Sequence, residues 1–123
     1  MSILNLSALV FLGGGLGSLS RFGIGKISSI FTESKFPFGT MIANILACIV
    51  LGVTLYYLKD KVENNQFIKY FVVIGFCGGF STFSTFSIET VNLLKDGFVL
   101  YGILNVLISI SLAFTVLWVL TKT

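Results

Sequence analysis

Histidine is missing from this 123-residue chain, which also has a single proline, two cysteines and only five acidic residues. Without histidine, a Ser/His/Asp set or a pair of neighbouring carboxylates, the sequence offers no catalytic arrangement, so we expect no enzyme. Its two thiols, Cys48 and Cys77, provide neither a disulfide framework nor a CxxC metal-binding spacing. The eight Lys and Arg residues are scattered singly between apolar runs, so the pI of about 9.0 does not indicate nucleic-acid binding.

Apolar residues dominate what remains. Hydrophobic residues make up 55% of the chain, charged residues 11%, and the mean hydropathy is +1.00. This composition predicts an integral membrane protein that lies in a lipid bilayer. Four apolar blocks, at about residues 3–24, 38–58, 67–94 and 98–120, are each long enough to cross ~30 Å of hydrocarbon. We therefore expect one all-α domain, residues 1–123, with four transmembrane helices; the first block lacks signal-peptide features and is expected to be a retained span.

The positive charges do not select an orientation for these spans. With both termini on one side of the membrane, each side receives four basic residues: Lys59, Lys61, Lys69 and Lys122 on one, and Arg21, Lys26, Lys35 and Lys95 on the other. This leaves the positive-inside rule almost nothing to act on. Either other features orient the chain, or it inserts both ways and forms an antiparallel homodimer.

The third block predicts a helix broken at mid-membrane. As one straight helix it would measure about 42 Å, well beyond the hydrocarbon thickness. Gly75, Gly78 and Gly79 precede a run rich in Ser and Thr, and glycine makes non-helical backbone inexpensive. Such backbone is tolerated at membrane depth only inside protein or beside a polar cavity. The helix ends at a break would attract a cation at free carbonyls or an anion at free N–H groups.

Hydroxyls and phenylalanines alternate in GFSTFSTFS, residues 79–87. A single Ser or Thr hydroxyl in a membrane helix commonly bonds to a carbonyl of the preceding turn or to a neighbouring helix. Five hydroxyls within seven residues are more than these two structural roles require. Phe83 and Phe86 are either ordinary packing or two ring edges turned toward a small anion.

Polar residues interrupt the other spans at helical spacing. Thr40 and Asn44 share one face of the second span, and Asn105 and Ser109 share one face of the fourth. Asn44 is either a link between helices or a hydrogen-bond donor on an ion path. Arg21, near the end of the first span, either reaches the lipid headgroups or provides a positive charge at a pore mouth.

Three motifs together resemble the Fluc (CrcB-type) fluoride channels of microbes over nearly the whole chain. They are GGGLGSLSR at 13–21, PFGTMIANILACIVLG at 37–52 and GFCGGFSTFSTFSIE at 75–89, of which the third is the most specific. The resemblance implies a dual-topology homodimer of four-helix subunits in the cytoplasmic (inner) membrane. It also implies passive export of toxic fluoride through two antiparallel pores.

The resemblance further implies roles for individual residues. The carbonyls of Gly78 and Ser81 from each subunit would hold a structural sodium ion at the dimer interface, although many members have Thr where this chain has Ser81. Phe83 and Phe86 would turn ring edges toward the fluoride path, beside the Asn44 amide. The remaining expected lining residues are Thr40, Thr82, Ser84, Thr85, Asn105 and Ser109.

Two other classes of membrane protein have this size. A small multidrug-type transporter needs an acidic residue in its first helix for proton exchange, and residues 1–32 contain no Asp or Glu. A non-transporting membrane subunit would give no ion flux after purification.

Overall fold

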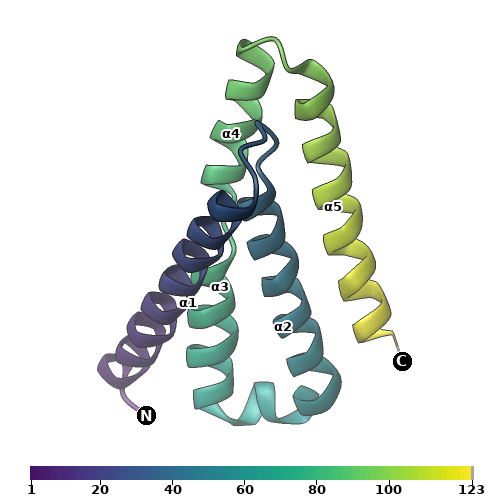
Figure 1. Cartoon of the computed structure of the whole chain (residues 1–123). Helices are drawn as coiled ribbons and strands as arrows, with labels where there is room; N and C mark the ends of the chain where they lie inside the picture. The colour runs from purple at the N-terminus through teal and green to yellow at the C-terminus, as the bar shows by residue number, and fades with distance from the viewer. Residues whose placement is uncertain (123) are drawn as a thin grey trace.

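The computed structural model describes residues 1–122 and shows no strand among them. Figure 1 shows the helices in chain order: α1 (Ile3–Phe31), α2 (Phe38–Asn64), the π-helix η1 (Phe67–Cys77), α3 (Gly78–Phe80), α4 (Ser84–Lys95) and α5 (Val99–Thr121). Four stretches are long and apolar enough to span a membrane, namely α1, α2, Phe67–Lys95 and α5. This confirms the expected all-α fold with four spans.

The first two helices extend beyond the apolar blocks that predicted them. The helix α1 continues to Phe31, and α2 continues to Asn64 with non-helical dihedrals at Leu58 (φ −126°, ψ 26°). Hydrophobicity marks the part of a helix that fits in lipid, whereas the helix itself continues as long as its backbone hydrogen bonds do. The expected end of the second span at residue 58 is therefore a kink, after which a polar helical segment follows.

Glycine brings α1 against η1 and α3 at backbone contact distance. A methyl group added at Gly13 would collide with the carbonyl oxygen of Phe71, and one added at Gly17 with that of Phe76. Gly79 of α3 is equally close to the backbone of α1. Small residues allow such approach between membrane helices, where packing drives association.

Of the three glycines before the Ser/Thr-rich run, Gly75 and Gly79 serve this packing, Gly78 meets no neighbouring atom within 4 Å, and none of them leaves the helix. Gly78 is helical (φ −64°, ψ −37°), and Gly97, in the turn between α4 and α5, is the one residue with positive φ (89°) in the described chain. The extended residue is Ser81, with φ −85° and ψ 159°. The sequence suggested glycine as the source of non-helical backbone, whereas the structure places it in the hydroxyl-bearing residues that follow.

The helices α4 and α5 complete the bundle. The last helix, α5, packs on α2 and α4. Both termini lie at the same end of the molecule, at the bottom of Figure 1, and the α4–α5 turn lies at the opposite end.

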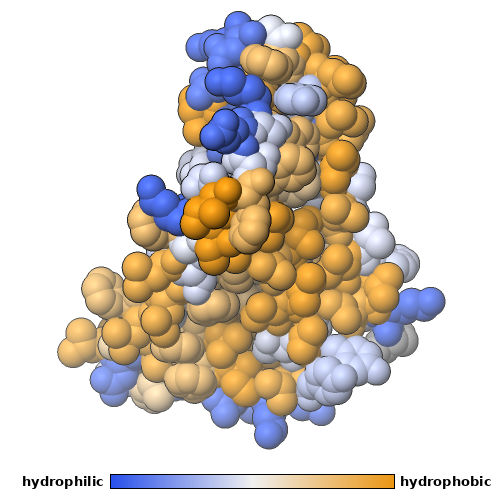
Figure 2. Space-filling view, viewed as in Figure 1, coloured by the Kyte–Doolittle hydropathy of each residue, from blue (hydrophilic) through white to orange (hydrophobic). Residues whose placement is uncertain are grey.

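The buried core is small and most large apolar side chains lie on the surface. Ala43, Ala47 and Phe80 form the buried cluster. Figure 2 shows hydrophobic residues over most of the visible face and hydrophilic residues gathered at its upper and lower ends. This distribution suits a bilayer, in which acyl chains or a second subunit cover the apolar belt.

Candidate functional site

Residues 81–83 separate α3 from α4, and the side chain of Asn44 bonds to this segment from α2. The Asn44 Oδ1 atom accepts a hydrogen bond from the N–H of Thr82 at 2.7 Å, and its Nδ2 donates to the Thr82 carbonyl at 3.1 Å. One amide thus replaces both helical partners of Thr82. A buried backbone group without a partner costs about 1–3 kcal/mol, so Asn44 stabilises the non-helical segment. The second hydrogen of its Nδ2 is not used in this pair.

The carbonyls of Gly78 and Ser81 are among those that leave the helical hydrogen-bond ladder here. In a continuous helix the Gly78 carbonyl would accept from the N–H of Thr82, which donates to Asn44 instead. The Ser81 carbonyl would accept from the N–H of Thr85, which donates to Thr82 Oγ1 at 3.1 Å. Carbonyls released in this way carry partial negative charge and are ligands for hard cations such as sodium.

The start of α4 presents partial positive charge, opposite in sign to that of the released carbonyls. Thr82 Oγ1 caps the helix by accepting the Thr85 N–H, and it lies 3.4 Å from the Ser84 hydroxyl. The first turn of α4 therefore directs its N–H groups and the positive end of its dipole toward the interruption.

A pocket of about 360 Å³ on one side of the interruption collects five of the expected path residues. We call it the central pocket, and it is lined by Asn44, Cys48, Ser81, Thr82, Phe83, Phe86, Ser109, Ile110, Ala113 and Phe114. The rings of Phe83 and Phe86 have centroids 6.2 Å apart and planes tilted by 44°. Phe83 is 80% exposed in the single chain. This pocket combines amide and hydroxyl groups with aromatic rings and has no charged lining residue.

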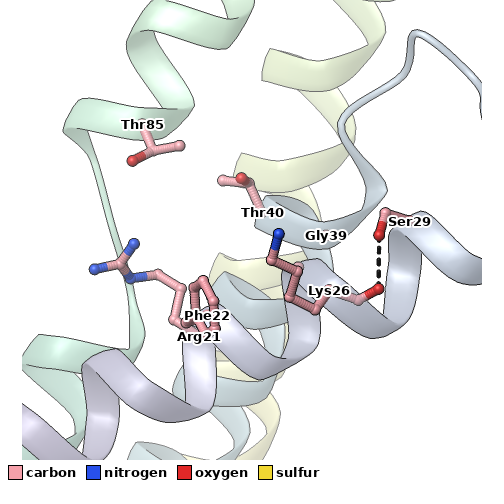
Figure 3. A pocket seen from close by; sticks show the side chains of 8 residues that line it. Arg21, Phe22, Lys26, Ser29, Gly39, Thr40 and Thr85 are labelled. Atoms are coloured by element: carbon pink, nitrogen blue, oxygen red, sulfur yellow. Dashed lines mark hydrogen bonds between the residues drawn. The ribbon is translucent and has the colours of Figure 1, made fainter.

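A second pocket, of about 300 Å³, carries positive charge. This basic pocket is lined by Arg21, Phe22, Gly25, Lys26, Ser29, Gly39, Thr40 and Thr85. Figure 3 shows the side chains of Arg21 and Lys26 from α1, Thr40 from α2 and Thr85 from α4 arranged around it. No acidic residue lines this pocket, so the two cations create an uncompensated positive potential.

Arg21 also has a structural partner. Its Nε donates to the Gly79 carbonyl at 3.2 Å, which ties α1 to α3 just before the interruption. Lys26 lies with its Nζ 5.5 Å from the centroid of the Phe22 ring. Arg21 therefore lies beside a polar pocket and makes a backbone contact that neither interpretation of the sequence included.

The polar residues of α5 form a buried hydrogen-bond chain. Asn105, 1% exposed, donates from Nδ2 to Thr90 Oγ1 at 2.9 Å and accepts from the Ser109 hydroxyl at 3.3 Å. Thr90 in turn donates to the Phe86 carbonyl at 2.8 Å. Ser109 thus lines the central pocket and is oriented by Asn105, which does not line it.

The other expected residues divide between the two pockets, with three exceptions, one of which is Gly78. Thr40, Thr85 and Arg21 lie at the basic pocket, whereas Ser84 is exposed and, like Asn105, lines neither pocket. Sequence reasoning missed two contributors, Lys26 and Thr90. Lys26 lies just beyond the apolar block 3–24 that predicts the first span, although its i, i+4 spacing from Phe22 is compatible with a continuing helix.

Four spanning helices, an interrupted segment and polar pockets lined by neutral donors and cations define a small multi-pass membrane protein suited to handling an anion. The chain belongs to the CrcB family, because its residues 8–120 match the family model described as "CrcB-like protein, Camphor Resistance (CrcB)".

Curated relatives cover most of the chain. A protein of Coxiella burnetii (strain CbuK_Q154) is 37% identical over 111 residues, which are 89% of this chain and 90% of the relative. A protein of Phocaeicola vulgatus is 43% identical over 115 residues, with 83% and 93% covered. One from Solibacter usitatus is 34% identical over 110 residues, with 89% and 90% covered. Each of the three is named "Fluoride-specific ion channel FluC".

Proposed function

We propose that this chain is a fluoride-specific ion channel, the activity for which its curated relatives are named. The observation that carries the proposal is the central pocket, where Asn44, Thr82 and Ser109 meet the rings of Phe83 and Phe86 beside a helix interruption. Channel activity needs no catalytic centre, and the channel would carry fluoride passively out of the cell across the cytoplasmic (inner) membrane. Export of this kind relieves fluoride toxicity.

Neutral donors suit the physical problem of moving fluoride. The ion is small and strongly hydrated, so a narrow path must replace its water with several hydrogen-bond donors. Amide and hydroxyl groups and the positive edges of aromatic rings do so without a full countercharge. Because no cation lines the central pocket, no full countercharge would trap the ion there, and the neutral donors would replace part of its hydration.

The basic pocket would concentrate fluoride at the mouth of this path. Arg21 and Lys26 attract anions over roughly 8 Å at physiological ionic strength. The hydroxyls of Thr40 and Thr85 then lead toward the central pocket along α2 and α4. The positive end of the α4 dipole favours an anion in the same direction.

We propose that the interruption lies at mid-membrane and faces a second subunit in an antiparallel, dual-topology homodimer. Ser81 is at the middle of the 29-residue span Phe67–Lys95. The exposure of Phe83 supports the dimer, because a ring on an ion path needs protein around it and not lipid. Balanced basic residues on the two sides support dual topology. Two such subunits would form two antiparallel pores. Cysteine labelling of a Lys59→Cys variant from both sides of intact vesicles tests this, and labelling from one side alone would contradict it.

The Gly78 and Ser81 carbonyls would hold a structural sodium ion between the two subunits. Both carbonyls are released from the helical ladder, which is the donor set such an ion requires. Bound sodium would supply positive potential between the two pores. Dimer stability measured in sodium and in N-methylglucamine buffers tests the assignment, and equal stability in both would contradict it.

The channel itself is tested by efflux from liposomes. Liposomes containing the purified protein and potassium fluoride are treated with valinomycin, and a fluoride electrode follows release. We expect rapid fluoride efflux and little chloride efflux in a matched potassium chloride experiment. Equal efflux of the two halides would overturn the selectivity, and absence of flux would favour a non-transporting subunit. Proton-driven uptake of a cationic drug would favour a multidrug-type transporter, which the lack of acidic residues in α1 disfavours.

A further inference from the structure

The two cysteines line one small pocket between α2 and the η1–α3 segment, and Cys48 also lines the central pocket. This thiol pocket has a volume of about 210 Å³ and is lined by Ala47, Cys48, Leu51, Val73, Cys77, Gly78 and Ser81. Both thiols are free; Cys48 is half-buried and Cys77 is 6% exposed. Two cysteines 29 positions apart in the sequence thus line the same pocket.

Sulfur is the metal-binding side-chain group that this pocket offers. Ala47, Leu51 and Val73 contribute apolar surface. The Ser81 hydroxyl already donates to the Cys77 carbonyl at 2.9 Å. Soft metal ions prefer thiolate ligands, whereas hard ions such as sodium prefer carbonyl oxygen, so the two kinds of ligand in this pocket select different metals.

We propose that the thiol pocket is a binding site for a soft, two-coordinate metal cation, held between the Sγ atoms of Cys48 and Cys77. With HgCl₂ as the reagent, two S–H bonds and two Hg–Cl bonds break and two Hg–S bonds form, and two protons and two chloride ions leave to water. Nothing is oxidised or reduced. The resulting bis-thiolate is neutral, which favours it at membrane depth, where net charge is costly.

Occupancy of the thiol pocket is expected to inhibit ion flux. Cys48 and Ser81 line both the thiol pocket and the central pocket, so a metal on Cys48 lies at the wall between them. Its bonds would fix the position of the Cys48 side chain beside Asn44, one turn away on α2. This consequence rests on the proposed channel function, whereas the binding itself does not.

Binding is measured on the purified full chain. Protein is mixed with HgCl₂, passed through a desalting column equilibrated with an excess of a monothiol, and analysed for mercury per chain. The two-thiol site predicts one mercury retained per wild-type chain, because two thiols held in one pocket act at a higher effective concentration than the free monothiol. Cys48→Ser and Cys77→Ser should each reduce retention at least tenfold. Wild-type-like retention in either variant, two mercury ions per chain or none in the wild type would overturn the site.

Serine is close to cysteine in size, and the elution profile of each variant shows whether it is folded. Fluoride efflux then tests the inhibition: HgCl₂ should slow wild-type flux at least tenfold, and dithiothreitol should restore it. The flux of each serine variant, compared with its own flux before treatment, should not fall with HgCl₂. Retained mercury with undiminished flux would overturn the inhibitory role. A wild-type protein that retains mercury but never conducts fluoride would contradict the proposed function and leave the metal site supported.

Discussion

Replacing Asn44 by Asp tests the central pocket with a change of one charge. The aspartate keeps an oxygen that can accept the Thr82 N–H but leaves the Thr82 carbonyl without its donor, so the fold should lose about 1–3 kcal/mol. Its negative charge, at about 4 Å from a passing fluoride and an effective dielectric constant of about 20, opposes the ion by about 4 kcal/mol. Each 1.4 kcal/mol corresponds to about tenfold in rate, so fluoride flux should fall by about a thousandfold.

The assay is fluoride efflux from liposomes, with size-exclusion chromatography to show that the variant is folded. Asn92→Asp is the matched control, because Asn92 is exposed on α4 and lines neither the central nor the basic pocket. The control should retain flux close to that of the wild type. If Asn44→Asp conducts within tenfold of the wild type, fluoride does not pass beside residue 44 and the proposed path is wrong.

Phe83→Ile should suppress fluoride efflux and leave the oligomer intact, because it removes a ring edge at the central pocket. The control is Phe11→Ile, on an exposed face of α1. Equal efflux in the two variants would show that the Phe83 ring is not on the path. Gly13→Ala should destabilise the protein by about 1–3 kcal/mol in thermal unfolding, because its methyl group meets the backbone of η1. Gly15→Ala, whose methyl group meets no neighbouring atom within 4 Å, should have no such effect, and similar melting temperatures for the two would contradict the packing. Lys26→Gln should lower flux severalfold at low ionic strength and little at about 1 M salt, whereas a salt-independent loss would argue against long-range attraction.

Hydropathy was sufficient to predict the four spans, because the cost of exposing polar groups to lipid acts on each segment separately. The helix bounds were harder to predict. In α1 the helix continues through Lys26 and Ser29 to Phe31, and only this continuation brings Lys26 to the same pocket as Arg21. A polar helical end and a polar loop have the same composition, so hydropathy cannot separate them.

The partners of the polar residues required the tertiary structure. Asn44 and Asn105 are both amides in apolar spans, yet Asn44 bonds to the backbone of a segment 38 residues away, whereas Asn105 bonds to Thr90 and Ser109. Helical periodicity predicts which residues share a face of one helix, but it does not predict which neighbouring helix packs against that face. The Arg21 contact with the Gly79 carbonyl was missed for the same reason.

The hydrogen bonds around the interruption suggest why a chain with so few charges can present both signs of potential at one place. Breaking a helix frees carbonyls on one side and N–H groups on the other. Distant side chains satisfy part of this set, because Arg21 bonds to the Gly79 carbonyl and Asn44 to both polar groups of Thr82. The Gly78 carbonyl and the first turn of α4 keep their partial charges. Because partial charges attract ions more weakly than full ones, an interrupted helix can favour an ion without trapping it, which a channel requires.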